Sequence, residues 1–434
     1  MRYYDIMHRK YSLLFLVLFC SLHTAFAQVG QSPYTVIGLG SLNSLATARN
    51  VGMGGVGIAN SHYLYLNNMN PALLVRNSYY TSFEAGLSLE SRELTTLEEQ
   101  DRTSSGGLDY VAIAFPILYE KITFSAGLAP YSTVNYNMIT ERPIEGSEAL
   151  SLIAFTGSGG TSQAYAATGF KIYKGLSAGL RASYIFGAIN EEITSSIINR
   201  NPGVPAYVAR YYSLTSFSDV LFAGGLAYRQ PISGKENHFL TAGFTYDLEA
   251  DLSATRSGRI ERAGSVDMPA PADSLLETTE GRYFLPASIG TGLAYEKLYH
   301  YSIGADFKWQ NWEDYRGFEG NPEENLGKSY RVAVGGEWTP DYASAKAGTY
   351  YKRMTYRMGL QYEKTPFVVN RENINDFGIN FGISLPVSNA SSIHTTFLFG
   401  QRGTTDNDLV RERYFRLGLG ITFNDRWFTK VKYD

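Results

Sequence analysis

The feature that most constrains this chain is a period-two alternation of apolar residues with small or polar ones, which begins at Tyr79. The stretch 178–187 places Ala, Leu, Ala, Tyr and Phe on one face, and the stretches 377–385 and 415–423 repeat the pattern. Successive side chains of a β-strand point to opposite faces, so each stretch predicts a strand with one apolar and one polar face. Repetition along most of the chain predicts one large sheet between two different environments.

The N-terminus and the composition indicate which environments these are. Basic residues precede the apolar run 11–22, and small residues follow at 25 and 27, so we expect residues 1–27 to be a cleaved signal peptide. The single cysteine, Cys20, lies inside this segment, so the mature chain forms no disulfide. No later apolar stretch reaches the length of a spanning helix. With 33 Tyr, 43 Gly and only 18% charged residues, the chain has the composition of an outer-membrane β-barrel.

The connections between the expected strands alternate in length. Short connections are expected at 119–121, 174–175, 232–237, 297–299 and 387–391, and long ones near 91–106, 138–160, 195–216, 257–281, 314–328, 367–374 and 402–410. Only the connection at 340–353 departs from this alternation. The fold predicted for residues 78–434 is all-β, a 14-stranded antiparallel transmembrane β-barrel in the outer membrane of a Gram-negative cell.

Residues 28–77 do not alternate, and we expect them to form a hatch inside the barrel lumen. Three of their glycines match the G-x-G-x-x-G spacing of a dinucleotide-binding turn, but the flanking strand and helix are missing and the next carboxylate is Glu84. Glycines also let a chain turn tightly and approach a wall closely. Asn70 is expected to cap a helix that starts at Pro71. The predicted hatch residues are Gly52, Gly54, Gly55, Gly57, Asn70, Pro71 and Ala72.

These motifs resemble a known family. The run 38–41, the Gly- and Ala-rich run 52–59 and the run 70–73, ahead of a 14-strand barrel, are similar to the FadL and TodX outer-membrane transporters for long-chain fatty acids and aromatic hydrocarbons. The end of the chain, 413–434, resembles the closing strand of the branch found in Bacteroidota. The resemblance implies a monomer, with membrane lipid and a hydrophobic small molecule as partners and no cofactor. One departure is that the family usually has an Asp in the Ala- and Gly-rich segment before the Asn-Pro-Ala run, whereas Asn60 and Asn67 occupy that neighbourhood here, which argues against a charged latch in the hatch.

The resemblance also implies a lateral opening at a kink in the third strand. Gly127 and Pro130 lie in the middle of that strand, and proline cannot donate a hydrogen bond to a neighbouring strand. The same residues fit a simple β-bulge equally well. Both interpretations, a bulge and a lateral gate, stay open from the sequence.

Several cations fall on the inward phase of the strands. A carboxylate head group of a ligand could be held there by charge-assisted hydrogen bonds. The alternative is a ladder of ion pairs that fills a narrow barrel. The candidate head-group residues are Arg181, Lys308, Arg331 and Arg357.

Apolar residues also gather in segments predicted to be outer loops, where they should face water. Exposed apolar clusters usually mark a binding surface. Long strands that rise above the membrane and pack on one another would give the same pattern. The residues of this predicted outer-loop site are Leu152, Ile153, Phe155, Ile197, Ile198, Tyr207 and Val208.

Other classes of function find little support. Residues 175–179 fit the G-x-S-x-G nucleophile elbow, but an expected strand follows where the elbow requires a helix. The histidines form no metal-ligand spacing, so we expect no catalytic residue, metal or cofactor. The net charge of -3 argues against nucleic acid.

Two functions remain. The first is passive uptake of hydrophobic small molecules, long-chain fatty acids or aromatic hydrocarbons, through a hatch-gated lumen. The second is service in a protein complex, as a PorV-like component of type IX secretion or as a subunit of an envelope assembly. A continuous apolar tunnel would favour the first, and a sealed lumen with large outer extensions would favour the second.

Overall fold

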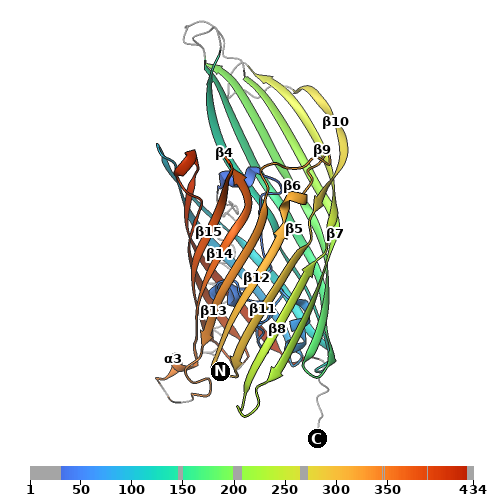
Figure 1. Cartoon of the computed structure of the whole chain (residues 1–434), viewed down its shortest axis with the longest axis vertical. Coiled ribbons are helices and arrows are strands. Elements are labelled where there is room, and N and C mark those ends of the chain that lie inside the picture. Colours follow the sequence, from blue (N-terminus) through green and yellow to red (C-terminus); the bar gives the residue numbers. More distant parts are fainter. Residues whose placement is uncertain are drawn as a thin grey trace, which may run out of the picture.

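The chain forms one antiparallel sheet that closes on itself into a barrel (Figure 1). The computed structural model describes residues 31–144, 150–198, 208–263, 272–344, 346, 348–388 and 390–427. The predicted signal peptide lies outside these residues. The strands of the wall are β2 (Thr81–Thr95), β3 (Gln100–Leu118), β4 (Ile122–Pro143), β5 (Leu150–Tyr173), β6 (Leu176–Ile198), β7 (Val208–Pro231), β8 (His238–Asp247), β9 (Ala250–Ala263), β10 (Ala272–Leu285), β11 (Ser288–Lys297), β12 (Tyr301–Asn311), β13 (Lys328–Trp338), β14 (Thr355–Val369), β15 (Glu372–Pro386), β16 (Ser392–Arg402) and β17 (Arg411–Asp425).

Two pairs of these segments each make a single barrel strand. β8 and β9 both pair with β7, one along its lower half and one along its upper half, and the chain is interrupted between them at 248–249. β11 and β10 pair with β8 and β9 in the same way, with the interruption at 286–287. The barrel closes where β17 pairs with β2, from Arg411 opposite Thr95 to Asp425 opposite Thr81. The predicted closed antiparallel barrel of 14 strands is therefore confirmed.

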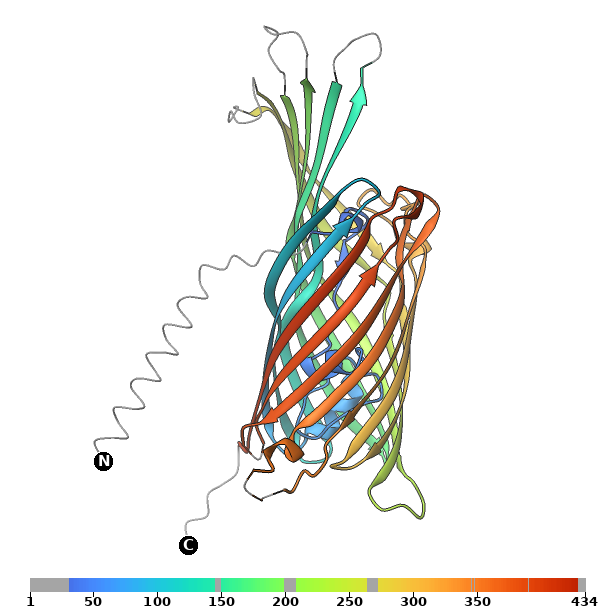
Figure 2. The same cartoon turned by 90° about the vertical axis from the view of Figure 1, so that its left-hand side faces the viewer.

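The barrel is much taller on one side than on the other. Figure 2 shows β4–β7 with β9 and β10 rising well above the remaining strands. We call these six strands the tall wall. At about 3.3 Å per residue, the 24 residues of β5 reach roughly twice as far as the 11 residues of β16.

Much of what the sequence predicts as long loops is strand in the structure. The expected loop 91–106 shrinks to a turn at 96–99, and most of 138–160 and 257–281 belongs to β4, β5, β9 and β10. The prediction was wrong here for a physical reason. Where these strands rise above the rest of the barrel, apolar and polar residues occur on both faces, so the alternation weakens.

The two faces of the wall differ as predicted. Outward-facing side chains include Leu180, Leu293, Ile303 and Met358, all more than half exposed. Inward-facing positions carry small or polar residues such as Ser125 and Thr241, which are buried. None of the helices in the described part of the chain is long and apolar enough to cross a membrane.

Residues 31–77, which we call the inner segment, lie inside the barrel (Figure 2). The segment contains the short elements η2 (Pro33–Val36), β1 (Ser41–Leu42), α2 (Ala48–Gly52) and η3 (Pro71–Asn77). α2 contacts β14–β17, and η3 contacts β3–β7, so the segment reaches both sides of the lumen. Three further short helices lie in connections of the wall: η4 (Trp312–Asp314), α3 (Tyr350–Arg353) and η5 (Asp406–Asp408).

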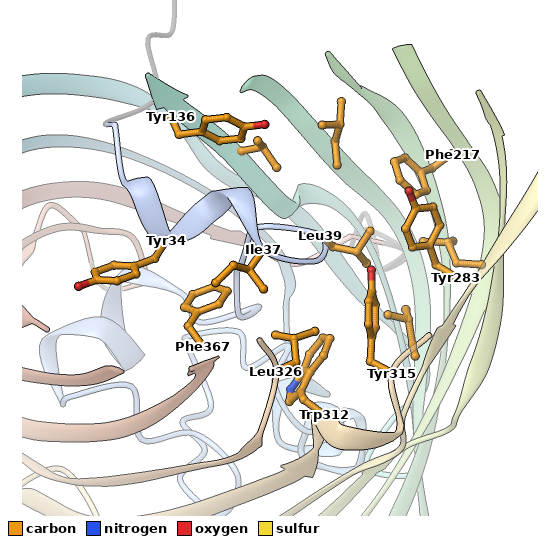
Figure 3. Packing of buried hydrophobic residues seen from close by; sticks show 14 of the residues in the cluster. Tyr34, Ile37, Leu39, Tyr136, Phe217, Tyr283, Trp312, Tyr315, Leu326 and Phe367 are labelled. Atoms are coloured by element: carbon orange, nitrogen blue, oxygen red, sulfur yellow. The ribbon is translucent and has the colours of Figure 1, made fainter. Parts of the chain in front are cut away.

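The upper lumen is filled by apolar and aromatic side chains. Figure 3 shows Ile37 and Leu39 of the inner segment pointing toward residues of the wall and of the β12–β13 connection, and the Tyr34 ring centroid lies 6.5 Å from that of Phe367. We call this group the upper cluster. Its labelled wall and connection residues are Tyr136, Phe217, Tyr283, Trp312, Tyr315, Leu326 and Phe367.

Candidate functional site

The inner segment touches the barrel wall with its main chain. Gly54 and Gly55 have φ of +73° and +83°, a left-handed conformation that favours glycine. A Cβ on Gly54 would lie 2.8 Å from the Leu360 carbonyl oxygen, and one on Gly55 would overlap the Arg331 guanidinium. Facing them, Gly335 and Gly359 of the wall leave room for the backbone of Met53. Glycines on both surfaces therefore place the segment in direct contact with the strands.

The third glycine of the G-x-G-x-x-G run binds an anion, but the anion belongs to the barrel. The Gly57 and Ile58 amides donate to Asp306 Oδ2 of β12, at 2.6 and 2.8 Å. The Asn67 side chain donates to the Gly57 carbonyl and holds the turn. The backbone that would cradle a phosphate in a nucleotide site is thus used to dock the inner segment on the wall.

A buried ion-pair triad joins α2 to two strands. Arg49 Nη2 lies 2.5 Å from Glu337 Oε1, and Arg357 Nε lies 3.0 Å from Glu337 Oε2. All three side chains are buried. Arg49 also donates to the Asn60 side chain at 2.8 Å. Arg357, a predicted head-group residue, therefore belongs to this triad rather than to a ligand site.

Asn70 has the predicted capping role and a second one. Its Oδ1 accepts from the Ala72 amide at 3.0 Å, as expected for the N-cap of η3, so this prediction is confirmed. Its Nδ2 donates to the Ile58 carbonyl and to the Leu226 and Phe244 carbonyls of the wall. Pro71 and Ala72 begin η3, which is a 3-10 helix.

The wall is split between β3 and β4, at the residues predicted as a lateral gate. The two strands pair only as far as Val111 opposite Leu128, just beyond Gly127 and just before Pro130. Above that point β4 continues along β5, with a register shift between Pro130 and Ser132. Gly127 and Pro130 thus lie where the wall divides.

The inner segment fills this split. Ser41 and Leu42 of β1 pair with Thr133 and Ser132 of β4. The Asn43 amide donates to the Tyr131 carbonyl at 2.9 Å. Further along, the Ser32 amide donates to the Asn135 carbonyl at 2.8 Å. The chain's own N-terminal residues therefore occupy the edge of β4 that the split exposes.

Above the split, the inner segment also reaches the last strand. Tyr34 donates its hydroxyl proton to the Val410 carbonyl at 2.5 Å, and Ser32 Oγ donates to Glu412 at 2.5 Å. Burial raises the pKa of Tyr34 to about 12, so this hydroxyl stays a donor at physiological pH. The N-terminal residues of the segment are therefore held both by β4 and by the start of β17.

Three of the four predicted head-group cations line one cavity of about 300 Å³ between the inner segment and the wall: Arg181, Lys308 and Arg331. Each already has a protein partner. Arg181 and Lys308 both donate to Asp247 at 3.0 Å, and Arg331 donates to Gln361 at 2.7 Å. The ion-pair interpretation therefore describes Arg181 and Lys308, whereas Arg331 donates to a neutral amide and to the Gly54 carbonyl. Lys308 is the most exposed of them, with 48% of its side chain accessible.

The predicted outer-loop site does not form one patch. Leu152, Ile153 and Phe155 lie in β5, Ile197 and Ile198 in β6, and Val208 begins β7, while Tyr207 lies outside the described residues. Strand alternation puts Ile153, Phe155 and Ile197 on the inner face of the tall wall and Leu152 and Val208 on the outer face. Val208 is buried. The single loop cluster was wrong because the residues belong to strands.

The residues that fit a nucleophile elbow lie in a turn and a strand. Gly175 ends the β5–β6 turn, and Ser177 lies in β6 with its hydroxyl donating weakly to the Ala227 carbonyl. No group of His, Cys, Asp and Glu in the described residues could hold a metal ion.

The comparison with solved structures identifies the fold. The chain superposes on the Pseudomonas putida toluene transporter TodX with a TM-score of 0.55 and 15% identity, covering 89% of this chain and 99% of that one. A Pseudomonas aeruginosa FadL homologue gives 0.56 and 13%, covering 89% and 99%. The Ralstonia pickettii toluene transporter TbuX gives 0.53 and 13%, covering 88% and 98%. The fold is that of the FadL and TodX channels.

The family is more specific. The BamG family model matches residues 7–434, and the chain belongs to the BamG family. No curated protein matches the chain. The predicted resemblance to FadL and TodX is therefore confirmed for the fold, and the placement in a Bacteroidota branch stays a prediction.

Proposed function

We propose that this protein is an outer-membrane barrel with a sealed lumen that serves as a subunit of an envelope protein assembly. The observation that carries the proposal is the tall wall, whose inner face carries a row of apolar side chains above the upper cluster. In this proposal the barrel spans the membrane, and its outward-facing apolar side chains contact the lipid. The tall wall then stands outside the cell.

The contacts of the inner segment support a sealed lumen. A hatch that moves must break its contacts at low cost. Moving this segment would separate the buried Arg49–Glu337 pair and free the Asp306 carboxylate from two amides. Breaking a buried ion pair costs several kcal/mol because it leaves an uncompensated charge. The split in the wall, the other route out, holds β1.

The inner face of the tall wall supports a protein partner. One row across the strands runs from Met138 through Phe155, Ile193 and Tyr211 to Ile260. Lower on the same face, Tyr136, Ile189 and Phe217 are buried in the upper cluster, whereas Ile193 and Ile260 are 37% and 38% exposed. Large open apolar patches on soluble surfaces usually mark interaction sites. A partner seated against this face would rest over the shorter strands of the barrel.

A charge placed on this face tests the proposal. Membranes of cells that make Ile193→Asp/Ile260→Asp are solubilised gently and compared with wild type by size-exclusion chromatography. We expect wild type to elute in a complex of defined composition and the variant to elute alone. The matched control, Ile139→Asp, lies on the outer face of the same wall and should leave the complex intact. Wild type that elutes as a lone monomer would contradict the proposal.

A second candidate function is uptake of a hydrophobic small molecule. The cavity beside Lys308 and the split at Pro130 favour it, since together they outline a route from the lumen toward the membrane. In this proposal the inner segment acts as a hatch, and β1 must leave the split for a ligand to pass.

A disulfide across the split tests this second function. Leu42 and Ser132 are opposite each other in the β1–β4 pairing, so Leu42→Cys/Ser132→Cys can be joined by oxidation in a mature chain expected to lack other cysteines. If the barrel is an uptake channel, oxidation should abolish uptake of labelled toluene and of a labelled long-chain fatty acid, and reduction should restore it. Uptake that is absent in wild type, or unchanged by oxidation, would remove this function.

A further inference from the structure

The outer surface of β12–β15 carries an apolar groove of about 790 Å³ near the lower end of these strands. Gly336 forms part of its floor, because an outward-facing glycine leaves a gap between larger neighbours. The side chains around that gap, Ile303, Val334 and Met358, are all apolar and exposed. Trp338 and Tyr356 close the lower end, with their ring centroids 6.1 Å apart. In a membrane barrel, Trp and Tyr in this position mark the headgroup level.

A folded connection begins at the same end of the groove. Residues 339–354 join β13 to β14, and the described part of this connection, 339–344, 346 and 348–354, contains α3, which lies below the end of β13 in Figure 1. We call this connection the lower flap. The Tyr356 hydroxyl donates to the Tyr351 carbonyl at 3.1 Å, and the Tyr350 hydroxyl donates to the Pro386 carbonyl at 3.0 Å. These bonds hold α3 against the strand ends that border the groove.

The lower flap is cationic. Lys346, Lys352 and Arg353 are its basic residues, and Asp341 is its only acidic residue. Within the described residues, none of these three cations takes part in an ion pair. The Arg353 guanidinium lies over the Tyr350 ring, 5.4 Å from its centroid, so its edge stays free to donate. An apolar groove thus ends at a group of unpaired positive charges.

We propose that this groove and the lower flap form a binding site for an anionic phospholipid, with an acyl chain in the groove and the phosphate beside Lys352 and Arg353. Hydrocarbon fits the groove because its walls are apolar. Phosphate oxygens accept charge-assisted hydrogen bonds from Lys and Arg. The inference rests on the membrane placement proposed above and not on the role in an assembly.

Fluorescence of Trp338 in lipid vesicles tests the site. In Trp309→Phe/Trp427→Phe, Trp338 is the one exposed tryptophan, since Trp312 is buried. The protein is reconstituted into phosphatidylcholine containing a small fraction of brominated phosphatidylglycerol, or the same fraction of brominated phosphatidylcholine. Each Lys or Arg near a membrane surface strengthens the binding of anionic lipid roughly fivefold. We expect the phosphatidylglycerol to quench Trp338 well beyond its share of the bilayer and the phosphatidylcholine to quench in proportion.

Two variants divide the site into its parts. Lys352→Ser/Arg353→Ser should make the two brominated lipids equal, while the matched control Lys121→Ser/Lys174→Ser, in turns at the same end of the barrel, should keep the preference. Gly336→Leu should fill the groove and lower the quenching by phosphatidylglycerol.

Three results would overturn the site. They are equal quenching by both lipids in Trp309→Phe/Trp427→Phe, a preference for phosphatidylglycerol that survives loss of Lys352 and Arg353, and unchanged quenching in Gly336→Leu. Folding of each variant is checked by heat-modifiable gel mobility. Failure of the protein to insert in vesicles would instead overturn the membrane placement.

Discussion

The inner segment is held in two ways at two heights of the lumen. In the lower lumen, its main chain lies against wall glycines and is fixed by directional contacts, above all the Arg49–Glu337–Arg357 triad and the amides on Asp306. In the upper lumen, Ser32, Tyr34 and β1 also form hydrogen bonds, but the buried contacts are mainly those of Ile37 and Leu39 among aromatic rings, and contacts of this kind are not directional. The difference teaches that the polar contacts set the register of the segment, whereas the apolar ones exclude water above it.

Among the substitutions that test this comparison, loss of the Glu337 carboxylate should lower the free energy of unfolding most. Glu337→Leu leaves the Arg49 and Arg357 guanidinium groups buried without a counter-charge, so we expect the free energy of unfolding to fall by about 3 to 5 kcal/mol. Urea unfolding in detergent micelles, followed by tryptophan fluorescence, measures it. Glu93→Gln removes the partner of the exposed Arg102 and should leave the free energy of unfolding close to that of wild type. A similar loss in both variants would mean that the triad does not fix the segment.

Truncation of a buried side chain in the upper cluster should cause the next largest loss in the free energy of unfolding. Ile37→Ala removes a buried side chain from packed surroundings, for an expected loss of about 2 to 4 kcal/mol in the same assay. Ile139→Ala, on an exposed position of the tall wall, serves as the control and should stay near wild type. If Ile37→Ala lowers the free energy of unfolding more than Glu337→Leu does, the apolar contacts stabilise the inner segment more than the polar ones do.

The smallest expected effect is at the cap of η3. Asn70→Ala removes the acceptor for the Ala72 amide and the donor to two wall carbonyls, at a cost of about 1 to 2 kcal/mol. Hydrogen exchange should speed up in residues 70–77 and stay slow in residues 48–52. The exposed Asn321→Ala is the control. Faster exchange in both stretches would show that the lower lumen loosens as one unit.

The sequence predicts the barrel better than its interior. Alternation is a local signal, so the strand number follows from it, and Asn70–Pro71 is a local capping signal that predicts η3. Arg49 was missed because its partner Glu337 is 288 residues away and no local pattern joins them. Arg357 was identified as an inward cation, but its pairing with Glu337 was missed because sequence does not show which carboxylate it meets. β1 was missed because two residues carry no period, although Pro130 marks the edge that it covers.

The contacts of Ser32 and Tyr34 with β17 impose an order on folding. These two residues emerge first in the described chain, and they bind Glu412 and the Val410 carbonyl, which belong to the last strand and the turn before it. A contact that spans 380 residues forms only after the intervening strands have been placed. Contacts so distant in sequence carry a large loop-closure entropy and slow folding. We therefore expect the N-terminal residues to bind β17 late in folding, when β17 pairs with β2 and closes the barrel.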